Sequence, residues 1–554
     1  MNEAIQTVRA YHHASKHSVQ AYAPSPGFLD WDTQPDPFRR YAGASLVALP
    51  LVKDSPGDAQ ACTYAQIYAS EAPQPERLSP KALGLFFELA LGLSAWKTTG
   101  MERWALRNNP SSGNLHPTEG YLLLWREVSA ELSPGLYHYA VREHVLERRA
   151  TLPETLAARL SVAHPGSFGA LGLSSILWRE AWKYGARAYR YCQLDVGHAL
   201  AAARISARVL GWSLKLDAVV GDATAAACFG LDRDEDFGVA EREHPDLLAV
   251  LGEPGMESAG IAWTEIAQAL GDWSGIANPL SLERVEWPQI TTVLPALHKA
   301  EAAPFITALI RHYLPEPPTP EADAVKACAI IRQRRSAQRM DPRVGLSFES
   351  FKRMLHRTLP TANTVPFDVQ PYPPAIQLLL FVHAVEGLEA GLYTLIRAAD
   401  RFGSFRAACT SVALEWEPVA NTGLPLYRLY APIDLRRNAA QFSCHQGIAG
   451  HSAFSLGMLA DLGQIMETDG AWAYRRLYWE AGMIGQVLYF EAEASGLQGT
   501  GIGCFFDDDV HQSLGLHPEG SWQDLYHFTI GRAVTDPRLR SEPAYAHLHE
   551  RCFE

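Results

Sequence analysis

Two stretches of the chain match each other, and this internal repeat constrains the fold more than any other feature. Residues 185–231 align with residues 470–516 without a gap at a shift of 285, and 11 of the 47 aligned positions are identical. Chance at ordinary composition gives roughly 3 identities over such a length. The identical pairs include Arg190 and Arg475, Gly197 and Gly482, and Asp222 and Asp507. We interpret the match as a duplication, so that one fold occurs twice in the chain.

Weaker matches precede this one in the same order. Residues 66–87 align with residues 334–355, and the Gly-Leu-Tyr of residues 135–137 occurs again at residues 391–393. Residues 312–322, HYLPEPPTPEA, have the proline content of a linker. We therefore expect an N-terminal copy over 1–285, a linker over 286–322 and a C-terminal copy over 323–554.

The strongest part of the repeat predicts a buried helix followed by a short strand. Residues 194–210 are apolar almost all round, which is typical of a helix inside a core. Gly197 and Gly482 would let another backbone approach, and Gly211 and Gly496 stand where helices end. Short apolar stretches at 214–220 and 502–506 are predicted strands. Helices and strands follow without a βαβ rhythm, so the predicted class is α+β.

The composition limits the classes of partner that the chain is expected to bind. The 554 residues carry a formal net charge of −13, which argues against nucleic acid and anionic membranes. No apolar run is long enough to span a membrane, and the N-terminus lacks the apolar core of a signal peptide. The eight cysteines are scattered, as in a reduced cytoplasmic protein. We interpret each as a small buried apolar residue and expect no metal site.

Several motifs, in order, resemble nitroreductase-fold proteins. Residues 107–119, RNNPSSGNLHPTE, are similar to their Pro-Ser-Ser/Ala-Gly segment, above all in the SagB-type branch of thiazole/oxazole (azoline) dehydrogenases. Residues 135–139 and 183–191 fit the same branch. In the second half, Arg334-Arg335-Ser336 resembles the opening motif, and residues 478–503 resemble the central helix and flavin loop. The resemblance implies two fused nitroreductase-like domains that pair within one chain as an intramolecular pseudo-dimer.

The resemblance also implies FMN as the cofactor. A phosphate dianion needs bidentate arginines and hydroxyl donors. Arg334, Ser336 and Arg532 match the phosphate ligands of the family, and Arg335 lies beside them. The alternative is that Arg334 and Arg335 form a solvated helix face. Where the family has Arg or Lys, this chain has Gln338, which removes a positive charge from the flavin and leaves its redox tuning open.

Two glycine-containing segments correspond to parts of the family that touch the flavin ring. Backbone at Gly501, Ile502 and Gly503 would lie against the ring, since glycine permits close approach. The alternative is an ordinary helix-to-strand turn. In the first half a small polar loop would edge the ring, with a plain turn as the alternative. The residues of this loop are Pro110, Ser111, Ser112, Gly113 and Asn114.

Lys183 and Tyr184 resemble the Lys-Tyr pair that serves proton transfer in azoline dehydrogenases. A lysine near a flavin can have a lowered pKa and act as a base. The alternative for both residues is an exposed helix start. We interpret His198 as a core residue and leave the role of His116 open.

Each half lacks the candidate site residues that the other half has. Opposite Arg334, Arg335 and Ser336 the first half has residues 66–68, Gln-Ile-Tyr, and Glu253 stands opposite Arg532. Opposite the Ser-Ser-Gly-Asn loop the second half has FDVQ at 367–370, and Thr468-Asp469 stand opposite the Lys-Tyr pair. The related nitroreductases are dimers whose flavins lie at the subunit interface. Complementary losses are therefore expected if one composite site, built by both halves, is kept.

Three functions stay open from the sequence. The first is an FMN-dependent dehydrogenase that oxidises a ring or peptide-derived substrate and passes electrons to oxygen or another acceptor. The second is an NAD(P)H-dependent nitro or quinone reductase, which needs only an open flavin face. The third is a flavin-binding scaffold subunit of a peptide-modifying complex.

Overall fold

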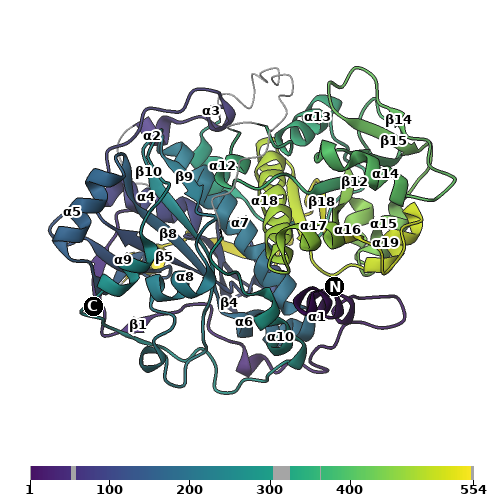
Figure 1. The fold of residues 1–554 in the computed structure, drawn as a ribbon. Helices are drawn as coiled ribbons and strands as arrows, with labels where there is room; N and C mark the ends of the chain where they lie inside the picture. The colour runs from purple at the N-terminus through teal and green to yellow at the C-terminus, as the bar shows by residue number, and fades with distance from the viewer. Residues whose placement is uncertain (1, 52–57, 303–324, 362–363, 551–554) are drawn as a thin grey trace.

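The computed structural model describes residues 2–51, 58–302, 325–361 and 364–550. The proline-rich segment 312–322 and Cys552 lie outside these residues. Figure 1 shows the N-terminal copy, purple to teal, on one side of the molecule and the C-terminal copy, green to yellow, on the other, with the helices α7 and α18 between them.

Each half contains a seven-stranded antiparallel sheet, and the two strand orders correspond. The orders are β2-β7-β6-β5-β8-β10-β9 and β14-β15-β13-β12-β16-β18-β17. Gly135 pairs with Leu124 and Gly391 pairs with Val382, so the repeated Gly-Leu-Tyr begins the equivalent strand each time. The first sheet comprises β2 (Ser45–Ala48), β5 (Thr118–Leu124), β6 (Gly135–Ala140), β7 (Val145–Thr151), β8 (Ser167–Ser175), β9 (Ser213–Leu216) and β10 (His244–Gly252). The second comprises β12 (Ile376–Val382), β13 (Gly391–Leu395), β14 (Glu417–Pro418), β15 (Leu426–Tyr430), β16 (Phe454–Asp461), β17 (Gln498–Ile502) and β18 (Trp522–Gly531). The predicted α+β class with two fused domains is confirmed.

The halves meet through a pair of long helices, α7 (Ala188–Val209) and α18 (Ala473–Ala494). They cross at the repeated glycines. A Cβ on Gly197 would lie 2.3 Å from the carbonyl oxygen of Trp479, and one on Gly482 would lie 2.2 Å from that of Leu194. Every residue of α7 is buried. The repeat is therefore strongest where the two backbones touch, because only glycine permits this approach.

Further helices cover the outer face of each sheet. Those on the first sheet are α5 (Glu154–Ala163), α8 (Asp222–Phe229) and α9 (Trp263–Ala269); those on the second are α14 (Phe402–Ala408), α15 (Arg436–Phe442), α16 (Gly447–His451) and α19 (Asp507–Leu514). The inner faces share one continuous apolar core with the central helices. The two domains consequently form an intramolecular pseudo-dimer.

Both ends of the chain reach the opposite half. Near the N-terminus, α1 (Glu3–Ala14) contacts the second half, where His12 bonds Gln523 and the following Lys16 bonds Asp508. Near the C-terminus, β19 (Arg540–Glu542) extends the hairpin of β3 (Leu93–Thr98) and β4 (Arg103–Arg107) in the first half. Figure 1 marks the N-terminus beside the second half and the C-terminus beside the first. These exchanged ends add to the contact between the halves.

Helix starts follow the weaker repeat. Ser79 caps α4 (Pro80–Ala90) and Ser347 caps α13 (Phe348–Arg357), and each serine accepts from a backbone amide three residues on. The short helices α3 (Tyr64–Tyr68) and α12 (Ala327–Gln333) precede them. Part of the expected linker is ordered as α10 (Pro288–Val293), which packs on α1.

The strand prediction for residues 502–506 is wrong, and that for 214–220 is too long. The strand β17 covers Gln498–Ile502, so the glycine-rich run itself is the edge strand. Beyond it the chain leaves the sheet, because the amide of Phe506 bonds the carbonyl of Phe442 rather than a strand. Likewise β9 ends at Leu216, and Asp217 follows outside it.

Candidate functional site

A cavity of about 740 Å³ lies between the halves. All thirteen residues that the sequence assigned to the cofactor line it, and so does Tyr184. Five of the thirteen come from the first half and eight from the second. Lys183 is not among the lining residues, although it neighbours Tyr184. The structure thus brings together motifs that are more than two hundred residues apart in the chain.

The Ser-Ser-Gly-Asn loop is held by two buried carboxyl groups of the first half. Ser111 Oγ donates to Glu180 Oε1 over 3.3 Å and accepts from the amide of His116 over 2.8 Å. The amide of Ser112 donates to Asp195 Oδ1 over 3.2 Å. Gly113 has φ +60°, where glycine is favoured, and a Cβ there would lie 2.6 Å from the hydroxyl oxygen of Tyr184. The loop therefore packs directly on the predicted catalytic tyrosine.

Tyr184 ends α6 (Leu177–Tyr184), and its ring faces the cavity. Burial, with Glu180 nearby, raises the pKa of Tyr184 well above its usual value, so the phenol keeps its proton. Lys183 is half-buried, with Nζ 5.5 Å from the centre of the Tyr184 ring and 5.7 Å from that of Trp31. Burial lowers the pKa of Lys183, while Glu180 opposes this. Tyr184 is thus the member of the pair that reaches the cavity.

Two carboxyl groups beside the cavity, those of Asp195 and Glu180, were not predicted from the sequence. Burial raises the pKa of Asp195 to about 8 and, with the charge of Asp195, raises that of Glu180 well above its ordinary value. Among the described residues, Asp195 Oδ2 and Glu180 Oε2 have no hydrogen-bond partner. Together the two groups can hold and release a proton near neutral pH.

Spacing along α7 could have revealed this wall of the cavity. Tyr191, Asp195 and His198 are four and three residues apart, which places them on one helix face. All three line the cavity. His198 is also the buried residue that we expected, with its ring bonded to Gln486 and Tyr526 of the second half. Burial lowers the pKa of His198 to about 3, so this imidazole is neutral.

The second half supplies the facing wall. Residues 334–338 run beside β17, where the amide of Ala337 bonds the carbonyl of Gly499. Tyr489 fixes both segments, since its hydroxyl lies 2.9 Å from Ser336 Oγ and 2.9 Å from the amide nitrogen of Gly501. No sequence pattern marks Tyr489, because tyrosines in a buried helix are common.

Three arginines lie on the second-half side of the cavity. Arg334 is buried and donates to the carbonyls of Asn108 and Arg107 across the domain boundary. Burial and the charge of Arg334 lower the pKa of Arg335 to about 10. Arg532 is exposed at the cavity. An anion here would relieve the repulsion between the buried guanidinium group of Arg334 and the half-buried one of Arg335.

Sequence and structure comparisons relate the chain to known proteins. No family model matches the chain. It is 29% identical over 202 residues to the trifolitoxin-processing protein TfxB of Rhizobium leguminosarum bv. trifolii, a match that covers 34% of this chain and about half (47%) of TfxB. Among solved structures, a protein from Anabaena variabilis provisionally described as a nitroreductase superposes with a TM-score of 0.68 at 23% identity. That superposition covers 95% of this chain and 99% of the other.

The chain has the nitroreductase fold. Since the Anabaena chain is covered almost completely, it too spans the length of both halves of this nitroreductase-fold protein. None of the described helices is long and apolar enough to cross a bilayer.

The second interface of the nitroreductase-fold pair is filled by side chains. Arg204 of α7, which aligns with Tyr489, donates to both oxygens of Asp368 over 3.0 and 2.7 Å. Phe367 and Val369, which stand where the other half has its serine loop, are buried beside it. Leu216, opposite the glycines of β17, is also buried. Among the described residues, buried side chains thus stand at positions that correspond to the lining of the cavity.

The residues around the cavity fit a flavin mononucleotide. The volume of the cavity lies within the range of cofactor sites, roughly 300–1,000 Å³. Buried polar atoms without a partner among the described residues border it, as a polar ring would require. These atoms are His116 Nδ1, Tyr191 Oη, Asp195 Oδ2 and Glu493 Oε2.

Proposed function

We propose that this protein is an FMN-dependent dehydrogenase that binds one flavin per chain in the composite cavity. The observation that carries the proposal is the convergence of the arginine segment, β17 and the serine loop on a single cavity. Arg334, Ser336 and Arg532 would hold the phosphate, with Arg335 beside them, and the backbone of Gly501–Gly503 and the loop Pro110–Asn114 would border the ring. When bound, FMN supplies a hydride acceptor.

Tyr184 is the residue placed to move a proton at the substrate. Its hydroxyl lies against the serine loop and keeps its proton at neutral pH, so it can take the proton that the substrate loses on oxidation only as it passes its own proton on. Lys183 lies behind it, close to Glu180 of the Glu180–Asp195 pair. That pair can receive the proton in turn, because the pKa of Asp195 is close to working pH.

The substrate class rests on similarity alone. The motifs resemble azoline dehydrogenases, which supports a ring within a peptide-derived substrate. TfxB is described as a trifolitoxin-processing protein, which supports a substrate modified while a toxin or a related product is processed. Oxygen or another acceptor would reoxidise the cofactor, and the cytoplasm is the proposed location.

Flavin stoichiometry tests the proposal. We expect purified protein to be yellow and to release one FMN per chain, as measured by mass spectrometry of the flavin against quantitative amino-acid analysis. Two FMN per chain would show that the second interface also binds flavin. Protein that neither retains nor takes up FMN would contradict the flavin site.

A further inference from the structure

Two cysteines from distant segments meet at one wall of the cavity. Cys504 follows β17 and lines the cavity, and Cys444 lies between α15 and α16. Their Sγ atoms are 2.6 Å apart, and both residues are half-buried. The other five described cysteines are buried, as the sequence predicted for all eight. For Cys444 and Cys504 that interpretation is wrong, because the two segments fold together beside an accessible space.

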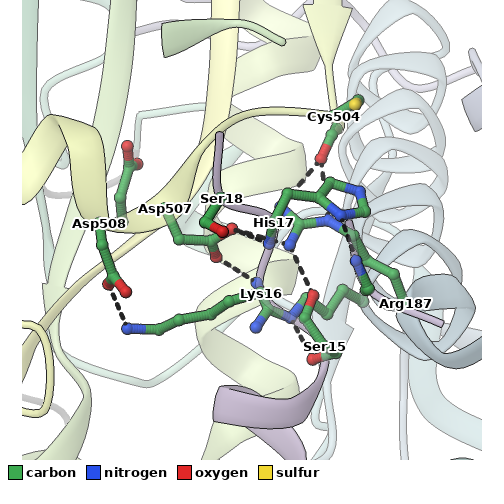
Figure 2. A network of polar contacts seen from close by, with 12 residues as sticks. Ser15, Lys16, His17, Ser18, Arg187, Cys504, Asp507 and Asp508 are labelled. Carbon is green, nitrogen blue, oxygen red and sulfur yellow. Dashed lines mark hydrogen bonds and ion pairs between the residues drawn. The ribbon is translucent and has the colours of Figure 1, made fainter. Parts of the chain in front are cut away.

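Polar groups from the first half surround Cys504. Figure 2 shows Cys504 close to His17, with Arg187 nearby. The amide of Ala23 donates to His17 Nδ1 over 2.8 Å, so in the neutral ring Nε2 carries the proton. Arg187 donates to the carbonyl oxygen of Gly503 over 3.1 and 3.2 Å, directly beside Cys504. The His17 ring and the Arg187 guanidinium thus both lie close enough to Cys504 to act on its charge.

These neighbours favour charge on one sulfur only. The Cys444 thiol, then His17 and Arg187, lower the pKa of Cys504 to about 5 although burial opposes this. The contact with Cys504 and burial raise the pKa of Cys444. Such a division is typical of an attacking and a resolving thiol. At the position of Cys504 the first half has Val219, so the pair belongs to the open interface.

We propose that Cys504 and Cys444 form a redox-active dithiol that reacts with low-molecular-weight disulfides at the wall of the cavity. Cys504 is the nucleophile and Cys444 the resolving thiol. This activity goes beyond the proposed dehydrogenase, and neither its chemistry nor its test needs bound flavin.

The reaction balances without another reagent. The Cys504 thiolate attacks one sulfur of the small disulfide, whose S–S bond breaks as a mixed disulfide forms and one thiolate leaves. Cys444 then gives its proton to a leaving thiolate and attacks the Cys504 sulfur. This step forms the Cys444–Cys504 disulfide and releases the second small thiol. Two protein thiols are oxidised while one disulfide is reduced to two thiols.

The test treats the reduced full-length protein with oxidised glutathione and maps the products by mass spectrometry. We expect a peptide pair joined through Cys444 and Cys504 with the loss of two hydrogens. Cys444→Ser should instead accumulate one glutathione on Cys504, and Cys504→Ser should form neither product. Cys409→Ser, which removes a buried cysteine of the same half, should behave as the wild type. A wild-type protein that leaves both thiols free, or glutathione on Cys444 in Cys504→Ser, would overturn the proposal.

Alkylation provides a second measurement on the wild-type protein alone. At pH 5.5 an ordinary thiol is almost fully protonated, whereas Cys504 should be mostly thiolate. We expect iodoacetamide to modify Cys504 about tenfold faster than free glutathione at that pH, after allowing for the weaker nucleophilicity of an acidic thiol. A rate equal to that of glutathione would contradict the nucleophile assignment.

Discussion

The two interfaces between the halves are related by the repeat, yet one encloses a cavity and the other is packed. At the open interface Tyr489 bonds the backbone of β17, while at the filled one the aligned Arg204 bonds Asp368. On the central helices, Asp195 lines the cavity and its Oδ2 has no hydrogen-bond partner within the described part of the chain, whereas the aligned Glu480 lies 2.6 Å from Arg397. The filled interface thus pairs polar groups at positions where the open interface leaves them facing the cavity.

What both interfaces keep is a cross-domain ion pair. Arg190 bonds Asp507 over 2.6 Å, and the aligned Arg475 bonds Asp222 over 2.6 Å. These residues are among the identities of the repeat, so the surviving sequence signal marks the contact between the domains rather than the ligand site. A repeat can therefore reveal a pseudo-dimer while its two sites diverge.

The largest expected effect concerns Tyr184. Tyr184→Phe removes the hydroxyl at the serine loop and should lower turnover of an azoline-type peptide by about 10²–10⁴-fold, the usual contribution of a positioned acid or base. Steady-state kinetics with flavin content measured in parallel checks this. Thr468→Ala, at the position aligned with Lys183, is the matched control and should leave turnover unchanged.

The same variant distinguishes the two enzyme classes. Hydride transfer to a nitroaromatic from NADH asks for no side-chain proton, so a reductase would lose only a few-fold in Tyr184→Phe. Full activity of the variant with the peptide would show that the tyrosine is structural.

Next in size is the stability difference between the two ion pairs. Asp507 is fully buried and bonds both Arg187 and Arg190, so Asp507→Asn should cost about 3–5 kcal/mol of unfolding free energy. Asp222→Asn should cost roughly 1–2 kcal/mol, because Arg475 keeps the carbonyls of Pro245 and Asp246. Urea unfolding curves compare them. Equal costs would show that the two ion pairs contribute equally to the free energy of unfolding.

The sequence predicted the fold, and it named residues from both halves that line one cavity, because those features depend on local patterns. Gly197 and Gly482 mark the helix crossing, and the order of motifs placed Arg334 and Ser111 at one site. Sequence patterns did not indicate the role of Asp195 or the contact between Cys444 and Cys504. Their surroundings come from segments that are distant in the chain, and burial without a partner is a property of the folded environment.

A smaller effect is expected for the cofactor phosphate. Arg532→Ala should weaken FMN binding by about 1.5–3 kcal/mol, the range for hydrogen bonds to charged groups. Glu253→Ala, at the corresponding position of the filled interface, should leave the affinity unchanged. Fluorescence titration of flavin-free protein measures both. Arg334→Ala should weaken binding too, but it also breaks bonds to Arg107 and Asn108 and therefore calls for a stability control.

The smallest effect concerns the pH dependence that Asp195 confers. Its pKa is about 8 in the folded chain and near 4 when unfolded, so folding binds a proton between these values. That contribution is fully present below about pH 4 and is lost as the pH rises towards 8. Asp195→Asn keeps the acceptor for the Ser112 amide but not the titration.

We therefore expect Asp195→Asn to be more stable than wild type at pH 8 relative to pH 6.5, by about 1–2 kcal/mol, in urea unfolding at the two pH values. Glu480→Gln is the matched change at the filled interface. It removes the charged partner of the buried Arg397, which keeps only its bonds to the carbonyls of Thr358 and Ile376, and should destabilise the protein at both pH values. If Asp195→Asn shows the same pH dependence as the wild type, the carboxyl is ionised in the folded chain. The contrast between an unpaired and a paired carboxylate at this helix position would then be lost.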